Sequence, residues 1–290
     1  MTRPGTRAIA RTAHGTTGAV HATTGAAQAM ARTARRAATL MAALALAGCA
    51  IGTDSGASDS PGRTDAAPTT LTVFAAASLT EAFDELAERF EARHPHVDVV
   101  VNSGGSGALA QQIVAGAPAD VFASAAEPPM QQVVNAGFAV APIDFATNTL
   151  ELVVPAGNPA AVTALDDLAA PELRVALCDP SVPCGTAAAM LLERAGVTAA
   201  PDTLESDVKA VLTKVMLGEV DAALVYRTDV IAAGNAVEGI EVAGAASVVN
   251  RYPIAALTDA ARTDSASDFV TFVTSTDGRS VLDAFGFGVP

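Results

Sequence analysis

The chain has 290 residues and a formal net charge of −14 at pH 7, although residues 1–49 hold six arginines and no acidic residue. The remainder therefore carries a formal charge of −20. Such a body repels nucleic acid, whose binding depends on clustered Lys and Arg at the phosphates. It also repels small anions at long range, so an anion site here must work through short-range contacts.

The N-terminal segment 1–49 has the pattern of an export signal. Arg35 and Arg36 precede an apolar run of about eleven residues, Ala37–Ala47, which is shorter than the roughly twenty that a membrane crossing needs. Leu46-Ala47-Gly48-Cys49 resembles the lipobox of bacterial lipoproteins, which implies a lipidated Cys49 and anchoring to the cell membrane outside the cytoplasm. Because a leader of ordinary length would begin at Met30, we expect translation to start there.

A polar segment, residues 50–70, follows the leader. It is small-residue-rich and contains proline, a composition that cannot form a core and indicates a flexible tether. About 220 residues remain, enough for one large domain or two lobes.

From residue 71 onward, strand-like and helix-like segments alternate. The expected strands are 71–77, 97–101, 120–123, 150–154, 174–177 and 221–226, and the expected helices are 78–93, 108–115, 130–136, 185–195, 207–217 and 266–285. Glycines 137, 196 and 218 each follow a helix, where a left-handed residue commonly ends it. This order predicts an α/β fold with sheets covered on both faces, whose ligands gather at the carboxyl ends of strands.

Two serines lie at such strand ends. Ser78 and Ser106 each follow a predicted strand and open a predicted helix, and neither segment contains Lys or Arg. Exposed N–H groups and the helix dipole make these junctions candidate anion sites. The alternative is helix capping, since Ser78-Leu-Thr-Glu81 fits a capping box and Ser106 fits an N-cap. Glycines beside Ser106 permit close approach of a ligand to the backbone, and no Walker lysine is present.

The remaining cysteines, Cys178 and Cys184, are six residues apart. Outside the cytoplasm we expect a disulfide rather than two free thiols. A metal pair is the weaker alternative, since only His94 and His96 accompany the cysteines after the leader. The absence of a Gly-x-Ser-x-Gly elbow argues against an exported hydrolase, so we expect no enzyme activity.

Several segments resemble the periplasmic molybdate-binding proteins of ABC importers. The resemblance runs in order from residue 71 to 290 and rests on Val73-Phe-Ala-Ala-Ala-Ser-Leu79, Ser106-Gly-Ala-Leu-Ala-Gln-Gln-Ile113, Gly116-Ala-Pro-Ala-Asp-Val-Phe-Ala-Ser124, Asp179-Pro-Ser-Val-Pro-Cys-Gly185, Asp207-Val-Lys209 and Leu224-Val-Tyr226. The proline-containing turn at 179–185 is one residue shorter than the family's turn and has Cys184 where alanine is common.

The resemblance implies the type II periplasmic-binding-protein fold, an α/β fold of two lobes joined by two crossing strands. Each lobe is a mixed sheet flanked by helices. Lobe I would comprise residues 71–148 and 254–290, and lobe II residues 149–253. An oxyanion would bind between the lobes through the hydroxyl and backbone donors of Ser78 and Ser106, the backbone N–H groups of Cys184 and Val208, and the phenol of Tyr226.

The expected function is high-affinity binding of molybdate or tungstate outside the cytoplasm and delivery to a membrane permease. The protein would act as a monomer with no cofactor and no direct ligand for a metal cation. Molybdate is fully deprotonated at neutral pH and needs donors only, whereas a phosphate site benefits from a carboxylate acceptor. Another tetrahedral oxyanion, sulfate or phosphate, is the alternative ligand.

Overall fold

The computed structural model describes residues 69–290. The expected leader, Cys49 and nearly all of the expected tether lie outside the described residues. The strands are β1 (Thr69–Ala76), β2 (Val97–Gly104), β3 (Val121–Ala123), β4 (Ile143–Pro155), β5 (Val175–Cys178), β6 (Thr203–Glu205), β7 (Ala222–Tyr226), β8 (Val237–Ile240) and β9 (Val249–Ala256).

Helices connect most of these strands. The α-helices are α1 (Thr80–Arg93), α2 (Ser106–Val114), α3 (Glu127–Asn135), α4 (Pro183–Ala195), α5 (Val208–Met216), α6 (Arg227–Ala233), α7 (Thr263–Thr274) and α8 (Thr276–Ala284). Short 3-10 turns are η1 (Ala77–Leu79), η2 (Leu165–Ala169), η3 (Gly234–Ala236) and η4 (Ala245–Ser247). Among the described helices, none has the length and apolarity that a bilayer crossing requires.

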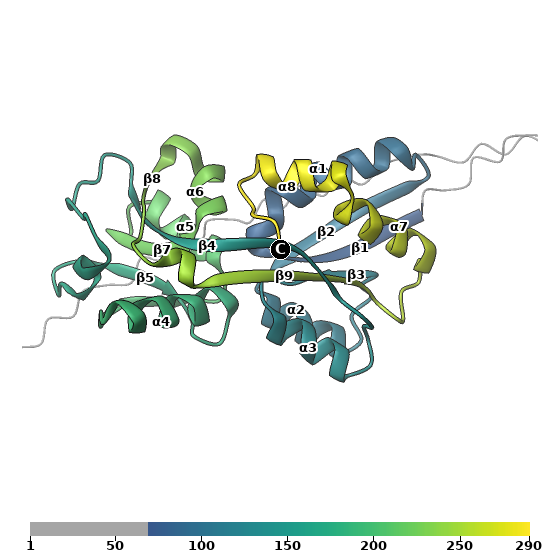
Figure 1. The fold of residues 1–290 in the computed structure, drawn as a ribbon, viewed down its shortest axis with the longest axis horizontal. Helices are drawn as coiled ribbons and strands as arrows, with labels where there is room; N and C mark the ends of the chain where they lie inside the picture. Colours follow the sequence, from purple (N-terminus) through teal and green to yellow (C-terminus); the bar gives the residue numbers. More distant parts are fainter. Residues whose placement is uncertain (1–68) are drawn as a thin grey trace, which may run out of the picture. The chain divides into compact units, whose positions relative to one another are not determined.

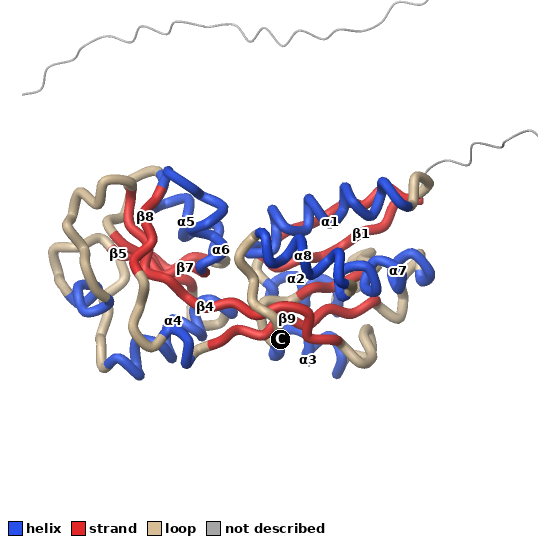
Figure 2. The backbone as a smooth tube through the Cα atoms, turned by 45° about the horizontal axis from the view of Figure 1, so that its top comes forward, coloured by secondary structure: helices blue, strands red, loops and turns tan. Residues whose placement is uncertain are grey.

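The strands form one mixed sheet in the order β2-β1-β3-β9-β4-β7-β5-β6, with β8 paired to β4. β1 is parallel to β2 and β3, and β5 is parallel to β6 and β7. Figure 1 shows α1, α7 and α8 on one face of the first strands and α2 and α3 on the other, and the turned view in Figure 2 agrees. The predicted α/β class is confirmed.

Two long strands, β4 and β9, cross from one half of the sheet to the other (Figure 1). The first part of β4, Ile143–Thr149, pairs antiparallel with β9, and its second part, Leu150–Pro155, pairs with β7 and β8. The far end of β9 pairs with β3. A residue on β4 or β9 near this change of partners is therefore close to both halves.

The hydrophobic core is divided in the same way. One cluster of buried residues comes entirely from residues 150–248. The two other clusters are formed by residues from the ranges 71–146 and 252–287. On α1, the apolar face seen in the sequence is the buried one, with Phe83, Leu86 and Phe90 fully inside. The core therefore passes from one cluster to another at the crossing strands.

The predicted C-terminal helix, 266–285, is wrong as a single element. It is two helices, α7 and α8, separated at Ser275, whose extended backbone starts α8 and whose hydroxyl accepts from Gly278 N–H at 3.3 Å. A side chain at Gly278 would place its Cβ 2.3 Å from Val273 O, so the two helices turn tightly here. The left-handed glycines predicted after α3, α4 and α5 are confirmed.

Candidate functional site

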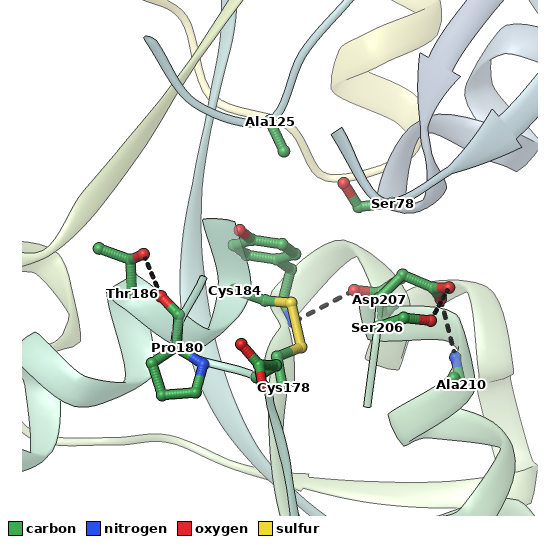
Figure 3. Close-up of a disulfide and its surroundings, with 12 residues drawn as sticks. Ser78, Ala125, Cys178, Pro180, Cys184, Thr186, Ser206, Asp207 and Ala210 are labelled. Carbon is green, nitrogen blue, oxygen red and sulfur yellow. Dashed lines mark hydrogen bonds between the residues drawn. A yellow bond between two sulfur atoms is a disulfide. The ribbon is translucent and has the colours of Figure 1, made fainter. Parts of the chain in front are cut away.

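A small cavity lies where β1 and β7 end and where α2, α4 and α5 begin. Its volume is about 20 Å³, and all five residues predicted for the site line it: Ser78, Ser106, Cys184, Val208 and Tyr226. The other lining residues are Ala76, Ala77, Gly104, Gly105, Ala125, Val182, Pro183 and Asp207. Figure 3 shows Ser78 and Ala125 on one side of this space and Cys184 on the other.

Three helix N-termini meet at this cavity. Ser106 is the first residue of α2, Val208 is the first of α5, and Cys184 is the second of α4, after Pro183. The N–H groups of a first helical turn have no acceptor within their own helix, and the helix dipole places partial positive charge there. The arrangement therefore favours a negatively charged ligand without a cationic side chain.

The two serine hydroxyls do not cap their helices. Neither η1 nor α1 has a side-chain cap, and neither does α2. Instead, Ser106 Oγ accepts from Ala125 N–H at 3.0 Å, and Ser78 Oγ lies 3.0 Å from Tyr252 Oη. Both serines are buried. The capping alternative considered from the sequence is therefore wrong for both positions.

Tyr226 brings an unpartnered hydroxyl to the cavity. It ends β7, is 1% exposed, and its Oη has no hydrogen-bond partner among the described residues. Burial raises the pKa of this phenol well above its ordinary value, so it stays neutral and able to donate. A buried polar group left unpaired costs about 1–3 kcal/mol, which an anion accepting from Oη would recover.

Lys209, which directly follows the site residue Val208, is engaged elsewhere. Its Nζ lies 2.8 Å from both carboxylate oxygens of Glu81 and forms an ion pair at 3.0 Å with Asp229 Oδ1. Asp229 is fully buried, and its other oxygen accepts from Tyr226 N–H at 3.2 Å. Burial raises the pKa of Asp229 to about 6, although the Lys209 ammonium opposes this rise.

A disulfide supports one wall. Cys178 Sγ and Cys184 Sγ are bonded, which ties the end of β5 to the first turn of α4 (Figure 3). The next residue is Gly185, where any Cβ would lie 1.9 Å from Asp179 O. The turn therefore requires glycine at this position, and the cross-link holds the Cys184 N–H in place.

A second, larger cavity of about 480 Å³ opens beside the first. It lies between α2, α3 and α4 and includes Gln111, Met190 and Arg251. Among the described residues, the one buried side-chain polar atom with neither a hydrogen-bond nor an ion-pair partner is Tyr226 Oη, and Tyr226 does not line this larger cavity. We therefore assign the site to the smaller cavity, where the orphan hydroxyl and three helix N-termini meet.

Sequence reasoning missed Tyr252 on β9 and Ala125 after β3, which contact Ser78 and Ser106, and it missed Asn148 on β4, which contacts Tyr252. These contacts join residues that are 19 to 174 positions apart, and nothing in the local sequence marks them. Within residues 69–290, no group of three or more His, Cys, Asp or Glu side chains is placed to hold a metal ion.

Comparisons with known proteins give the family of the chain. A model of the bacterial extracellular solute-binding protein family matches residues 71–288. The molybdate-binding protein ModA of Mycobacterium tuberculosis is 42% identical over 253 residues, covering 87% of this chain and 97% of that protein. A putative ABC transporter substrate-binding lipoprotein of Bacillus subtilis, YvgL, is 33% identical, covering 86% of this chain and 95% of its own length.

Solved structures share the fold. The periplasmic molybdate-binding protein of Azotobacter vinelandii superposes with a TM-score of 0.67 at 24% identity, over 76% of this chain and 99% of that one. A sulfate-binding protein of M. tuberculosis has a TM-score of 0.65 at 20% identity, over 76% of this chain and 86% of its own. The chain therefore belongs to the bacterial extracellular solute-binding protein family, and its resemblance to the molybdate-binding proteins is confirmed over most of its length.

Proposed function

We propose that this chain binds molybdate outside the cytoplasm and delivers it to the permease of an ABC importer. The mycobacterial relatives named as molybdate-binding proteins support this proposal, since the match to this chain covers 97% of their length. Tungstate, a tetrahedral dianion of nearly the same size, would bind comparably. The protein acts as a binding component and catalyses no reaction.

One observation carries the proposal: the cavity wall brings together buried hydroxyl groups and three helix N-termini, and none of its residues is Lys or Arg. The Tyr226 hydroxyl is buried without a hydrogen-bond partner among residues 69–290, and Tyr226 lines the space where three helix N-termini meet. The one carboxylate on the wall, Asp207, is turned to its own helix, where its Oδ1 accepts from Ala210 N–H at 3.0 Å. A fully deprotonated oxyanion fits such a wall, whereas a protonated one lacks an acceptor for its hydrogen.

Hydrogen bonds from neutral donors can supply the binding free energy of a tight site without a cationic side chain. Each hydrogen bond to a charged partner contributes about 1.5–3 kcal/mol. Six or seven of them, held at helix ends before the ligand arrives, are enough for roughly −11 kcal/mol, the free energy of a ~10 nM site, after dehydration is offset. Sulfate is a smaller tetrahedron and would fail to reach donors from both halves at once.

Residues outside the described region complete the proposal. Cys49 would carry a lipid and residues 50–70 would tether the binding body to the membrane surface. The B. subtilis relative named as a lipoprotein supports this arrangement. The mature protein would act as a monomer that needs no cofactor.

A thermal-shift series tests the proposal with a protein covering residues 50–290. Molybdate and tungstate should raise the melting temperature strongly, and sulfate and phosphate at the same concentration should not. Ser78→Ala combined with Ser106→Ala should keep the fold and lose the molybdate shift. Equal stabilisation by sulfate, or no effect of molybdate on the unsubstituted protein, would overturn the assignment.

A further inference from the structure

A buried chain of hydrogen bonds runs from the crossing strands to Ser78. Asn148 Nδ2 on β4 donates to Thr228 Oγ1 at 2.8 Å and to Tyr252 Oη at 3.4 Å. Tyr252 on β9 continues the chain to Ser78 Oγ at 3.0 Å. All four side chains are at most 4% exposed, so water does not compete for these bonds.

The direction of the first bond is fixed by Asn148. Its Oδ1 accepts from Thr149 N–H at 3.0 Å, so its amide nitrogen must be the end that faces Tyr252. An amide nitrogen only donates, and Tyr252 Oη is therefore an acceptor in this contact.

The direction of the second bond follows from the first. Burial raises the pKa of Tyr252, which keeps the phenol neutral with a single proton to donate. Two side chains hydrogen-bond to Tyr252 Oη among the described residues, Asn148 and Ser78, and only Ser78 Oγ, at 3.0 Å, can accept this proton. Ser78 Oγ then accepts from Tyr252, and its own proton is free to point into the cavity.

Ser106 is set in the same direction by a different group. Its Oγ accepts from Ala125 N–H, which can only donate, so the Ser106 proton is also free for the cavity. Two hydroxyls that could accept or donate are thus both presented to the ligand as donors.

We infer that Tyr252, oriented by Asn148, is a positioning residue that turns the Ser78 hydroxyl toward the bound anion as a donor and so selects anions that carry no proton. The inference rests on the proposed oxyanion site and adds a basis of selectivity other than size. With the opposite polarity, Ser78 would donate to Tyr252 and show only lone pairs to the cavity. That arrangement would favour a monoprotonated anion.

Tyr252→Phe tests the inference because it removes one hydroxyl and keeps the ring. The ring packs edge-on against Phe145, Tyr226 and Phe287, and these contacts remain. Titration calorimetry at pH 8 would compare molybdate with arsenate, which is then mainly the hydrogen arsenate dianion. The two ligands share their charge and are close in size, and they differ by a proton.

In Tyr252→Phe, the molybdate dissociation constant should rise about tenfold, and the preference for molybdate over hydrogen arsenate should fall by at least that factor. Tyr226→Phe is the matched comparison, since it removes a direct donor and should weaken both anions while leaving the Ser78 polarity intact. Asn148→Ala, which releases Tyr252, should lower the same preference and serves as the second variant if Tyr252→Phe does not fold.

Unchanged molybdate affinity and an unchanged preference in a folded Tyr252→Phe or Asn148→Ala protein would overturn the inference, as would tighter molybdate binding. These outcomes leave the proposed function standing, because the unsubstituted protein still binds molybdate. Failure of the unsubstituted protein to bind molybdate would instead refute the proposed function itself.

Discussion

Replacing Lys209 by methionine should destabilise the protein in a pH-dependent way. Lys209 on α5 joins Glu81 of the first half to the buried Asp229 of the second, and its side chain is 23% exposed while that of Asp229 is 0% exposed. Methionine preserves most of the packing and removes the charge. Asp229 would then be a buried carboxylate without its cation, and its pKa would rise further above the present value of about 6.

The direction of the pH effect on stability follows from the raised pKa of Asp229. A carboxyl whose folded pKa exceeds its unfolded value contributes stability at low pH, and that contribution is lost as the pH rises through the folded pKa. In the unsubstituted protein the loss ends near pH 6, where Asp229 ionises. In Lys209→Met it continues to higher pH, because the folded state keeps the proton.

The size of this loss of stability follows from the pH interval over which the folded Lys209→Met protein keeps the Asp229 proton and the unsubstituted protein does not. Each pH unit over which only the folded state holds the proton is worth about 1.4 kcal/mol of unfolding free energy. From pH 6 to pH 7.5, Lys209→Met should lose about 2 kcal/mol that the unsubstituted protein does not lose. The lost pair with Glu81, whose side chain is 42% exposed, adds at most about 1 kcal/mol and does so at both ends of this range.

Urea unfolding without oxyanion, at pH 5 and at pH 7.5, measures this difference. The destabilisation by Lys209→Met should be small at pH 5 and about 2 kcal/mol larger at pH 7.5. Adding Asp229→Asn should remove the pH dependence, because the titrating group is gone. Equal destabilisation at both pH values, or a pH dependence that survives Asp229→Asn, would refute the reasoning.

Three further predictions concern the cavity. Tyr226→Phe should raise the molybdate dissociation constant at least tenfold in calorimetry and leave the ligand-free melting temperature unchanged or slightly higher, because it removes an unpaired buried hydroxyl; a large loss of ligand-free stability would contradict this. Gly105→Ala should weaken molybdate binding strongly, since its Cβ would lie 2.5 Å from Ser206 O in the opposite half. Gly107→Ala is the matched control and should bind normally, because nothing lies within 4 Å of its Cβ. Equal effects of the two substitutions would refute the importance of the close approach between Gly105 and Ser206. Replacing both Cys178 and Cys184 by alanine should lower the melting temperature yet change molybdate affinity only a few-fold, because the Cys184 donor is a backbone N–H; loss of binding in a folded protein would contradict a backbone role.

The elements whose apolar residues have a regular spacing, and the glycines that end helices, could be predicted from the sequence. The apolar strand β1 and the amphipathic helix α1 follow from residue spacing, and the glycines after α3, α4 and α5 end those helices as expected. The five predicted residues that line the cavity came from the resemblance to the molybdate-binding proteins, and only Ser78 and Ser106 were also indicated by their place between a strand and a helix. The split between α7 and α8 was missed although it has a local signal: residues 274–280 contain no apolar side chain, and Ser275 caps α8.

β9 and its Tyr252 could not be predicted, for a physical reason. The strand contains polar Asn250 and Arg251 followed by Pro253, which is a weak strand signal, and its order comes from pairing with β4 and β3. Tyr252 meets Ser78 across 174 residues of chain, so no spacing in the sequence indicates the contact. The polarity of the serine hydroxyls likewise exists only once both halves of the sheet are assembled.

A crystal structure of the protein with molybdate tests the central claim most directly. The account predicts one tetrahedral anion in the small cavity, with oxygens about 2.6–3.1 Å from the hydroxyls of Ser78, Ser106 and Tyr226 and from the backbone nitrogens of Cys184 and Val208, and with no Lys or Arg in contact. An anion bound instead in the larger cavity beside Arg251, or held by Lys209, would contradict a site built from neutral donors.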